Sequence, residues 1–509
     1  MKNILAYFTP APARPAGIPG EALDRKYRRL RLQQVAAMLV VYAMFYVCRL
    51  AFSATKKMMV DQGAYTAREL GFVGSAMLIA YALGKATNGF LADRANVKRF
   101  IGFGLFVSAA ANFLVGFHLP AAALTALWFV NGFAQATGAP CCVVGQSRWF
   151  AKKERGTYYG IWSCSNNLGE ALAYVLTAYI MVWAGKTWGA DAAWRSGFWG
   201  ASLMGLAGIG IVALFFKDSP QSEGLPPVEE WRGGGSAAPA QSAAKQFSAE
   251  EVKRGQKIAI ASLSVWLVAL AGAFFAASRY AIIDWGIFFL EAKKGYSTGT
   301  ASWIVTINSI VGAVSSGLSG FVSDKLFKGS RHELALTGGL LNITGLSLMM
   351  FVPGQHLWVD VAAMTCFGLA AGILLTFLGG LMAVDLVPAC AAGAALGIAG
   401  MGNYIGAGIQ SATSGFLIKP IAAVAKTLDG GAKLLEDGST LLPNGRLVDA
   451  AGNAVNRFYS FDFDIAGFDF TVDWIAVFWV GMAVLSTVCA LGVWRIAHLQ
   501  GKTNTQKGN

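Results

Sequence analysis

Apolar runs of about 20 residues recur along this chain and constrain its fold more than any other feature. A run of that length forms a helix that can cross the hydrocarbon core of a bilayer, which is roughly 30 Å thick. Only 14% of the 509 residues are charged, against about 25% in a typical soluble domain. We therefore predict an all-α membrane protein.

The apolar runs predict twelve transmembrane helices in two groups of six. The first group covers residues 33–53, 70–92, 99–118, 121–148, 157–184 and 196–216. The second group covers residues 258–290, 298–323, 334–353, 357–386, 391–418 and 473–496. We expect an N-terminal bundle over 1–216, a flexible cytoplasmic linker over 217–256 and a C-terminal bundle over 257–509.

A second polar segment, about 419–472, separates the last two spans and is expected on the outer face as a structural cap. It contains an Asn-Gly pair at 444–445, a sequence favoured in tight hairpin turns. Residues 458–464 alternate between apolar and polar side chains. These two features predict a small β-hairpin element within the insert.

The two halves repeat one another. GlyPheLeuAlaAspArg at 89–94 follows the second span, and GlyPheValSerAspLys at 320–325 follows the eighth. Such a duplication is the parallel-repeat layout of secondary transporters, whose binding site lies between the halves. Charge pairing at these helix ends would open and close a gate, so we assign gating to the charged residues Asp93, Arg94, Arg99, Asp324, Lys325 and Arg331.

Basic residues are distributed unevenly across the predicted membrane. Most of the 41 Lys and Arg residues lie in loops on the N-terminal side of the spans. The positive-inside rule therefore places both termini in the cytoplasm. The net charge of +13 reflects this topology, so nucleic acid is not an expected partner, whereas the lipid bilayer is. We expect a monomer.

Arg49 and Arg279 each lie inside an apolar run, at matching positions of the two halves. An arginine in a bilayer costs roughly 2.5–3.5 kcal/mol on insertion scales, so a repeated pair indicates function. Tyr42, Tyr46 and Arg49 follow helical steps of four and three and share one face. Because guanidinium suits bidentate binding of phosphate or carboxylate, we predict an anion site near the middle of the membrane.

The alternative interpretation is structural: each arginine pairs with a buried carboxylate and locks the helices together. Asp284 and Glu170 are the candidate partners. Lys85, in the middle of the second span, has Ser316 as its repeat counterpart, so its charge belongs to one half only. It could attract an anion or neutralise Glu170.

Further polar residues share helical faces inside the spans. Trp162, Asn166 and Glu170 recur every four residues in the fifth span. Asn166 could bind a substrate hydroxyl or phosphate, and Glu170 could couple protons or balance charge. Gln135 in the fourth span and Tyr404 in the eleventh are additional cavity candidates, with hydrogen bonding between helices as the alternative role for the amide.

Signatures of soluble enzymes are missing from the sequence. There is no GxxxxGK[ST] phosphate-binding loop and no HExxH motif, so neither ATP hydrolysis nor metalloenzyme activity is expected. The seven cysteines lie in or beside apolar runs without a CxxC pair. We predict buried apolar roles for them and expect no metal or other cofactor.

With these residues in hand, the chain resembles the major facilitator superfamily, and more narrowly its organophosphate:phosphate antiporters. GlyPheLeuAlaAspArg and the following LysArg resemble the signature loop of the superfamily. The narrower resemblance rests on TyrArgArgLeuArg (27–31), TyrValCysArg (46–49), GlyAlaProCysCys (138–142), LysLysGluArgGly (152–156) and ArgTyrAlaIleIleAspTrp (279–285).

The resemblance implies that Arg49 and Arg279 hold a phosphate, with Lys85 and the tyrosines lining the cavity. It implies exchange of an organophosphate for inorganic phosphate in a bacterial inner membrane, as the two halves rock around the site. Asn166 stands where the glycerol-3-phosphate carrier of the family has a histidine, so proton-linked binding through that residue is not expected. The alternatives are a sugar-phosphate sensor that signals to a partner kinase, and a carrier of another organic anion.

Overall fold

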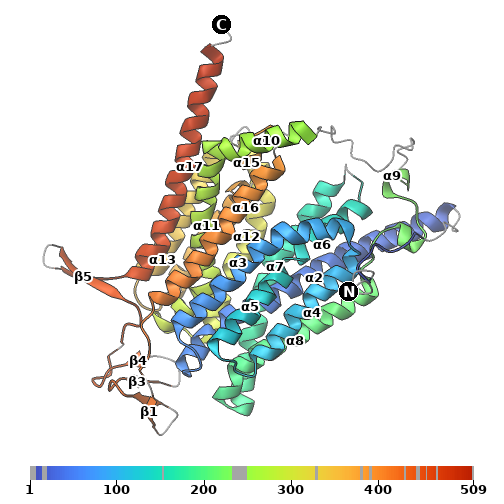
Figure 1. Ribbon diagram of the computed structural model, residues 1–509. Helices are drawn as coiled ribbons and strands as arrows, with labels where there is room; N and C mark the ends of the chain where they lie inside the picture. The colour runs from blue at the N-terminus through green and yellow to red at the C-terminus, as the bar shows by residue number, and fades with distance from the viewer. Residues whose placement is uncertain are drawn as a thin grey trace.

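The computed structural model describes residues 7–13, 20–151, 154–231, 249–326, 331–378, 382–388, 392–422, 424–428, 432–442, 447–453, 455–465 and 468–506. Helices make up most of it (Figure 1). In the first half they are α2 (Gly20–Asp61), α3 (Ala67–Arg94), α4 (Val97–Val115), α5 (Ala121–Gln135), α6 (Gly138–Trp149), α7 (Arg155–Trp188), α8 (Ala190–Phe215), η1 (Gln221–Glu223) and α9 (Val228–Trp231). In the second half they are α10 (Ala249–Ala261), α11 (Leu263–Ala292), α12 (Thr298–Leu326), α13 (Arg331–Phe351), α14 (Leu357–Thr376), α15 (Met382–Asp385), α16 (Ala392–Phe416) and α17 (Trp474–Gln506).

Each of the twelve expected spans coincides with one of these helices or with an adjacent pair. Within the described residues, nine helices are long and apolar enough to cross a membrane: α2, α4, α7, α8, α11, α12, α13, α14 and α17. The other spans correspond to α3, to α5 with α6, and to α16. The chain is therefore an all-α membrane protein.

Two spans that we expected to be continuous are interrupted. The span 121–148 divides into α5 and α6, because Pro140 cannot donate to the carbonyl of Ala136 and its ring would clash with that group. The span 258–290 divides at Ser262, whose hydroxyl accepts a hydrogen bond from the Val265 amide and caps α11. The span 357–386 contains α14 and the short α15, and residues 379–381 between them lie outside the described part of the chain.

The helices form two bundles that contact each other along a few helix pairs. In the first bundle α2 packs on α7 and α8, and α3 packs on α5. In the second, α11 packs on α16 and α17, and α12 packs on α14. The main contacts between bundles are α3 with α16, α7 with α12, and α2 with α11. Gly415 permits the first of these, since an added Cβ would lie 2.5 Å from the Ala67 carbonyl oxygen.

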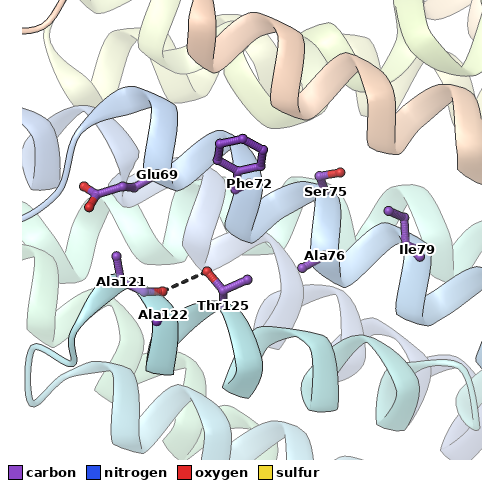
Figure 2. Close-up of a pocket in the computed structure, with 8 residues that line it drawn as sticks. All are labelled: Glu69, Phe72, Ser75, Ala76, Ile79, Ala121, Ala122 and Thr125. Atoms are coloured by element: carbon purple, nitrogen blue, oxygen red, sulfur yellow. Dashed lines mark hydrogen bonds between the residues drawn. The ribbon is translucent and has the colours of Figure 1, made fainter.

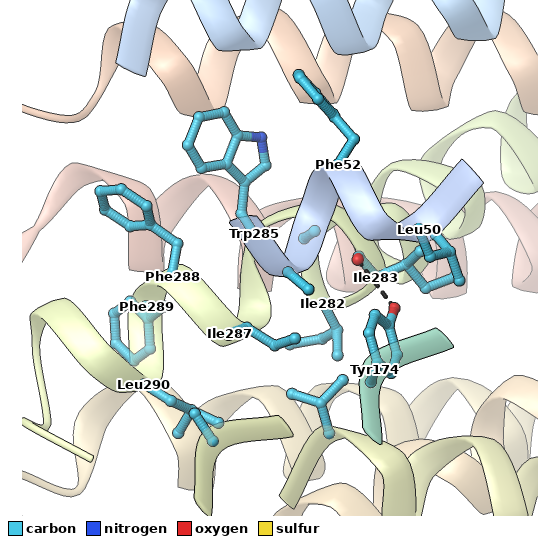
Figure 3. Packing of buried hydrophobic residues seen from close by; sticks show 14 of the residues in the cluster. Leu50, Phe52, Tyr174, Ile282, Ile283, Trp285, Ile287, Phe288, Phe289 and Leu290 are labelled. Atoms are coloured by element: carbon cyan, nitrogen blue, oxygen red, sulfur yellow. Dashed lines mark hydrogen bonds between the residues drawn. The ribbon is translucent and has the colours of Figure 1, made fainter. Parts of the chain in front are cut away.

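The two ends of the molecule differ in how they are packed. We call the end that carries residues 419–472 the insert face, and the end that carries the start of α2, α9, α10 and the end of α17 the terminal face (Figure 1). Toward the insert face one apolar core joins both bundles, and Figure 3 shows Phe52 of α2 and Tyr174 of α7 beside Ile283 and Trp285 of α11. Toward the terminal face each bundle has its own core. The bundles are therefore closed together at the insert face.

The insert consists of two small antiparallel sheets. β1 (Val424–Thr427), β2 (Lys433–Leu435), β3 (Thr440–Leu441) and β4 (Leu447–Val448) form one sheet in chain order. β5 (Ser460–Ile465) and β6 (Phe468–Asp473) form a hairpin from Ser460 opposite Asp473 to Ile465 opposite Phe468. The hairpin predicted from residues 458–464 is confirmed, whereas the Asn-Gly pair at 444–445 lies outside the described residues.

Part of the expected linker is ordered against the first bundle. The ring of Trp231 stacks on that of Tyr27 with 4.2 Å between centroids, and the Tyr27 hydroxyl donates to the Pro226 carbonyl oxygen at 3.2 Å. The segment 217–231 therefore packs on the start of α2. Residues 232–248 lie outside the described part of the chain.

Candidate functional site

Arg49 lies on α2 and is 6% exposed, where it faces aromatic rings and an amide. Its guanidinium carbon lies 4.5 Å from the ring centroid of Tyr81 and 4.9 Å from that of Tyr46. Its Nη2 donates to Gln135 Oε1 at 3.4 Å, and its Nε has no hydrogen-bond partner among the described residues. Cation–π contacts and one long hydrogen bond stabilise the charge without neutralising it. Arg49 can therefore still bind an anion.

Arg279, its repeat counterpart on α11, instead faces a carboxylate. Its Nη2 lies 3.4 Å from Glu170 Oε2 on α7, and Asn308 of α12 donates to Glu170 Oε1 at 3.2 Å. The Glu170 side chain is 1% exposed and that of Arg279 is 12% exposed. This is the pairing that the structural interpretation expected for one arginine. It joins the two bundles through a pair with no net charge.

Asp284, the other carboxylate considered as a partner for the arginines, pairs elsewhere. Its Oδ1 lies 2.6 Å from Lys56 Nζ and accepts from Ser53 at 3.1 Å, while Ser411 of α16 donates to Oδ2. The Lys56 side chain is completely buried, and its Nζ lies 3.9 Å from the Trp285 ring centroid. This group connects α2 with α11 and α16 nearer the insert face than Arg49.

Aromatic rings surround the two arginines. Tyr42 lies 5.7 Å from Tyr46 and 5.0 Å from Trp162 between ring centroids. Tyr404 of α16 lies 4.8 Å from Tyr81. The structure thus brings together four of the predicted residues from both bundles, Tyr42, Tyr46, Trp162 and Tyr404.

Lys85 is the most exposed of the predicted site residues. Its Nζ lies 4.9 Å from the Tyr404 ring centroid, so it belongs to the same cluster, on the terminal-face side of Tyr81. It forms no ion pair with Glu170 among the described residues, because the partner of Glu170 there is Arg279. A role for Lys85 in attracting an anion stays a prediction.

Buried amides complete the site. Gln135 is fully buried, and its Nε2 has no hydrogen-bond partner within the described chain. Asn166 is half-buried, and its Oδ1 also has no hydrogen-bond partner within the described chain. A cavity of about 10 Å³, the size of roughly one water molecule, adjoins Arg279, Asn167 and Asn308.

Sequence reasoning missed three residues of this cluster. Tyr81 lies four residues before Lys85, on the same face of α3, and that spacing could have identified it. Tyr280 follows Arg279, and its ring lies 6.4 Å from that of Tyr404. Asn308 lies in the eighth span without a neighbouring motif, and only its contact with Glu170 reveals it.

A separate pocket lies away from the arginines. It has a volume of about 550 Å³ and opens between α3 and α5 (Figure 2). Its lining is mostly apolar and small, and Glu69 is its single charged residue. Without a cation it does not suit an anion, so it is not the predicted site.

Of the predicted gate, the structure describes only one side chain. Arg99 donates to the Tyr7 carbonyl oxygen at 2.7 Å, and its guanidinium lies over the Tyr7 ring at 4.6 Å. Arg99 therefore contacts the N-terminal segment. The remaining members of the predicted gate lie at helix ends on the terminal face, and their side chains are outside the described part: Asp93, Arg94, Asp324, Lys325 and Arg331.

Comparisons with known proteins agree with this architecture. A family model described as Major Facilitator Superfamily matches residues 37–411. The glycerol-3-phosphate transporter of Bacillus subtilis (strain 168) is 31% identical over 82% of this chain and 92% of its own length. The membrane sensor protein UhpC of Salmonella typhimurium is 30% identical over 79% of this chain and 89% of its own.

Solved structures of low sequence identity share the fold. A mutant of the nucleoside transporter NupG superposes with a TM-score of 0.62 at 13% identity, covering 92% of this chain and 99% of that one. A bacterial homologue of the human lysosomal transporter Spinster, in an inward-facing and unoccupied conformation, gives 0.61 at 16% identity, covering 76% and 82%. At these identities the likeness concerns the fold alone.

Proposed function

Because this chain belongs to the Major Facilitator Superfamily and to its organophosphate transporter family, we propose that it exchanges an organophosphate for inorganic phosphate. Relatives named as transporters of glycerol phosphate, hexose phosphate and phosphoglycerate support a phosphorylated substrate. Membership of a carrier family supports transport without catalysis. We place the protein in a bacterial inner membrane as a monomer with both termini in the cytoplasm.

The observation that carries this proposal is the pair of arginines where the bundles meet. Arg49 comes from α2 and Arg279 from α11, and a phosphate bound by both would contact both bundles. In a site shielded from bulk water, charge-assisted bidentate hydrogen bonds to phosphate are strong and specific. Lys85 adds a third cation at the entrance from the terminal face.

The packing supports alternating access around that pair. The bundles share a core at the insert face and have separate cores at the terminal face, so the arginines are reached from the terminal face. With the termini in the cytoplasm, this is an inward-facing arrangement. Opening toward the other side requires separation of α2 from α11, including the Lys56–Asp284 pair.

The test is counterflow in proteoliposomes loaded with inorganic phosphate. We expect external labelled phosphate to enter only when phosphate or an accepted organophosphate is inside, and a panel of glycerol, hexose and glycerate phosphates to compete. Arg49→Ala and Arg279→Ala should each lose the exchange, whereas Lys426→Gln on the exposed strand β1 should retain it. Normal exchange in both arginine variants would rule out the phosphate clamp.

A sensor role is the second candidate, because UhpC is among the similar proteins. A sensor can bind sugar phosphate at the same site and signal to a partner kinase. Tight binding of an organophosphate without counterflow would favour this role. A third candidate, a carrier of another organic anion, requires that phosphate fail to compete.

A further inference from the structure

The base of the insert is fixed to the second bundle. The Lys419 amide donates to the Arg457 carbonyl oxygen at 2.8 Å, which joins the insert to the segment that follows α16. The Trp474 amide donates to the Tyr459 carbonyl oxygen at 2.9 Å, which joins it to α17. Phe458 is fully buried in the core at the insert face, with its ring 5.5 Å from that of Phe289 on α11. Residues 457–459 therefore move with the second bundle.

From this base, Arg457 reaches the first bundle. Its Nη1 lies 2.5 Å from Asp61 Oδ1, at the end of α2. Its side chain is 1% exposed, and its guanidinium lies 5.2 Å from the Phe288 ring centroid of α11. Nε and Nη2 of Arg457 have no hydrogen-bond partner among the described residues, so Asp61 is the carboxylate that this buried charge contacts directly there.

The two partners depend on each other unequally. Asp61 also accepts from Lys57 of its own helix at 2.5 Å, and would keep that bond if the bundles separated. Arg457 forms no second ion pair within the described chain, although the buried carboxylate of Glu291, on α11 of its own bundle, lies close enough to interact with it electrostatically. Separation at the insert face would therefore remove the carboxylate that Arg457 contacts directly and leave it the more distant Glu291, which disfavours the open arrangement.

We propose that the insert holds the insert face closed through the Arg457–Asp61 pair, and thereby shifts the conformational equilibrium toward the arrangement open at the terminal face. This inference rests on the alternating access in the proposed function, but it concerns a contact made by the insert and not the substrate site. The Lys56–Asp284 pair lies within the helices themselves, so Arg457–Asp61 is an additional closure that the insert supplies.

The test measures how often the insert face opens. Ser53→Cys places a thiol of similar size at the contact between bundles, where Ser53 is 5% exposed. The native Cys164, Cys366, Cys390 and Cys489 are first replaced by serine, because Cys164 is exposed and would react with a maleimide. The purified protein in detergent is then treated with a bulky hydrophilic maleimide, and the labelling rate is compared with and without Arg457→Gln. We expect Arg457→Gln to label about tenfold faster, which corresponds to about 1.4 kcal/mol, and Arg457→Lys to label at an intermediate rate.

Three controls make the result specific. Lys426→Gln removes an exposed cation of the same insert and should leave labelling unchanged. Asp61→Asn should also accelerate labelling, and the double variant with Arg457→Gln should label no faster than the faster single variant, because both remove one contact. Without the Ser53→Cys reporter, the buried native Cys48 should remain unlabelled in each variant, which reports correct folding.

Equal labelling of Arg457→Gln, Asp61→Asn and the parent would overturn the proposal, as would strictly additive effects in the double variant. The assay uses no substrate. If labelling is accelerated but the protein shows no phosphate counterflow, the closure by the insert is supported and the transport proposal is refuted. If counterflow is normal but labelling is unchanged, the transport proposal is supported and the closure by the insert is refuted.

Discussion

Arg49 and Arg279 occupy repeat-related positions in the two bundles, yet in the described part of the chain only Arg279 forms an ion pair with a carboxylate. Arg49 lies among the rings of Tyr46 and Tyr81 with an amide as its polar partner, whereas Arg279 lies 3.4 Å from Glu170. The two halves thus share the position of the arginine but differ in whether a carboxylate neutralises its charge. From this difference we propose that Arg49 is the main anchor for an anion, and that Arg279 contributes fully only when it leaves Glu170.

The largest effect should follow the loss of Arg49. Arg49→Gln removes an uncompensated charge from the site, and we expect phosphate affinity to fall at least about 100-fold, since each hydrogen bond to a charged group contributes about 1.5–3 kcal/mol. Equilibrium binding of labelled phosphate to purified protein measures this. Arg49→Lys should restore part of the affinity, because lysine supplies charge without the bidentate geometry. An affinity loss below about threefold in Arg49→Gln would remove the distinction between the two arginines.

The second effect concerns the partner left behind. Arg279→Gln leaves Glu170 as a buried anion close to the incoming phosphate, so we expect both a lower thermal midpoint and about 30-fold weaker binding. Adding Glu170→Gln should recover most of the stability and part of the affinity, because the net charge of the pair is restored. Thermal unfolding and phosphate binding of the single and double variants form the test. A double variant that behaves like Arg279→Gln alone would mean that Glu170 does not act through Arg279.

A smaller change in affinity is expected from Glu170→Gln alone. Because the arginines neutralise the charge of the anion, the affinity for phosphate should stay within about threefold of that of the parent. The pH dependence of exchange should change, because an ionisable group between the bundles has been lost. Counterflow measured across a pH series reports both quantities. A large loss of affinity with an unchanged pH profile would refute this assignment and make Glu170 a direct substrate contact.

A similarly small effect on affinity, but one that depends on salt, should come from Lys85. It is exposed and lies beside the Tyr404 ring, so solvent screens its charge, and Lys85→Gln should weaken binding about threefold. The loss should shrink further as the salt concentration rises, which a titration of affinity against ionic strength would show. A loss as large as that of Arg49→Gln, independent of salt, would place Lys85 inside the anion site as a primary contact.

Most of the fold could be predicted because apolar runs and helix length are local properties. The breaks at Ala136 and Ser262 were not predicted, since a proline in the first turn and a cap interrupt the helix without interrupting the apolar run. The first span was expected to end near residue 53, where cations begin, but α2 continues to Asp61 and buries Lys56 completely. Its partner Asp284 lies in the other bundle, and no spacing in the sequence reveals such a contact.

In the candidate site, too, features within one helix could be predicted and contacts between helices could not. Faces defined by helical steps, such as Tyr42 with Tyr46 and Arg49, could be predicted, because they depend on residues of one helix. Which carboxylate meets which cation depends on the packing of different helices. The sequence therefore left Glu170 open between several partners, and the structure places it beside Arg279 and Asn308.

The most direct test of the central claim compares phosphate binding by two variants with the same bundle contacts at the insert face. One is Arg49→Gln, and the other is the charge-balanced double variant Arg279→Gln with Glu170→Gln. The account predicts that the double variant binds labelled phosphate within about tenfold of the parent, whereas Arg49→Gln loses at least about 100-fold. Equal losses in the two proteins, or a larger loss in the double variant, would contradict the claim that Arg49 is the main anchor.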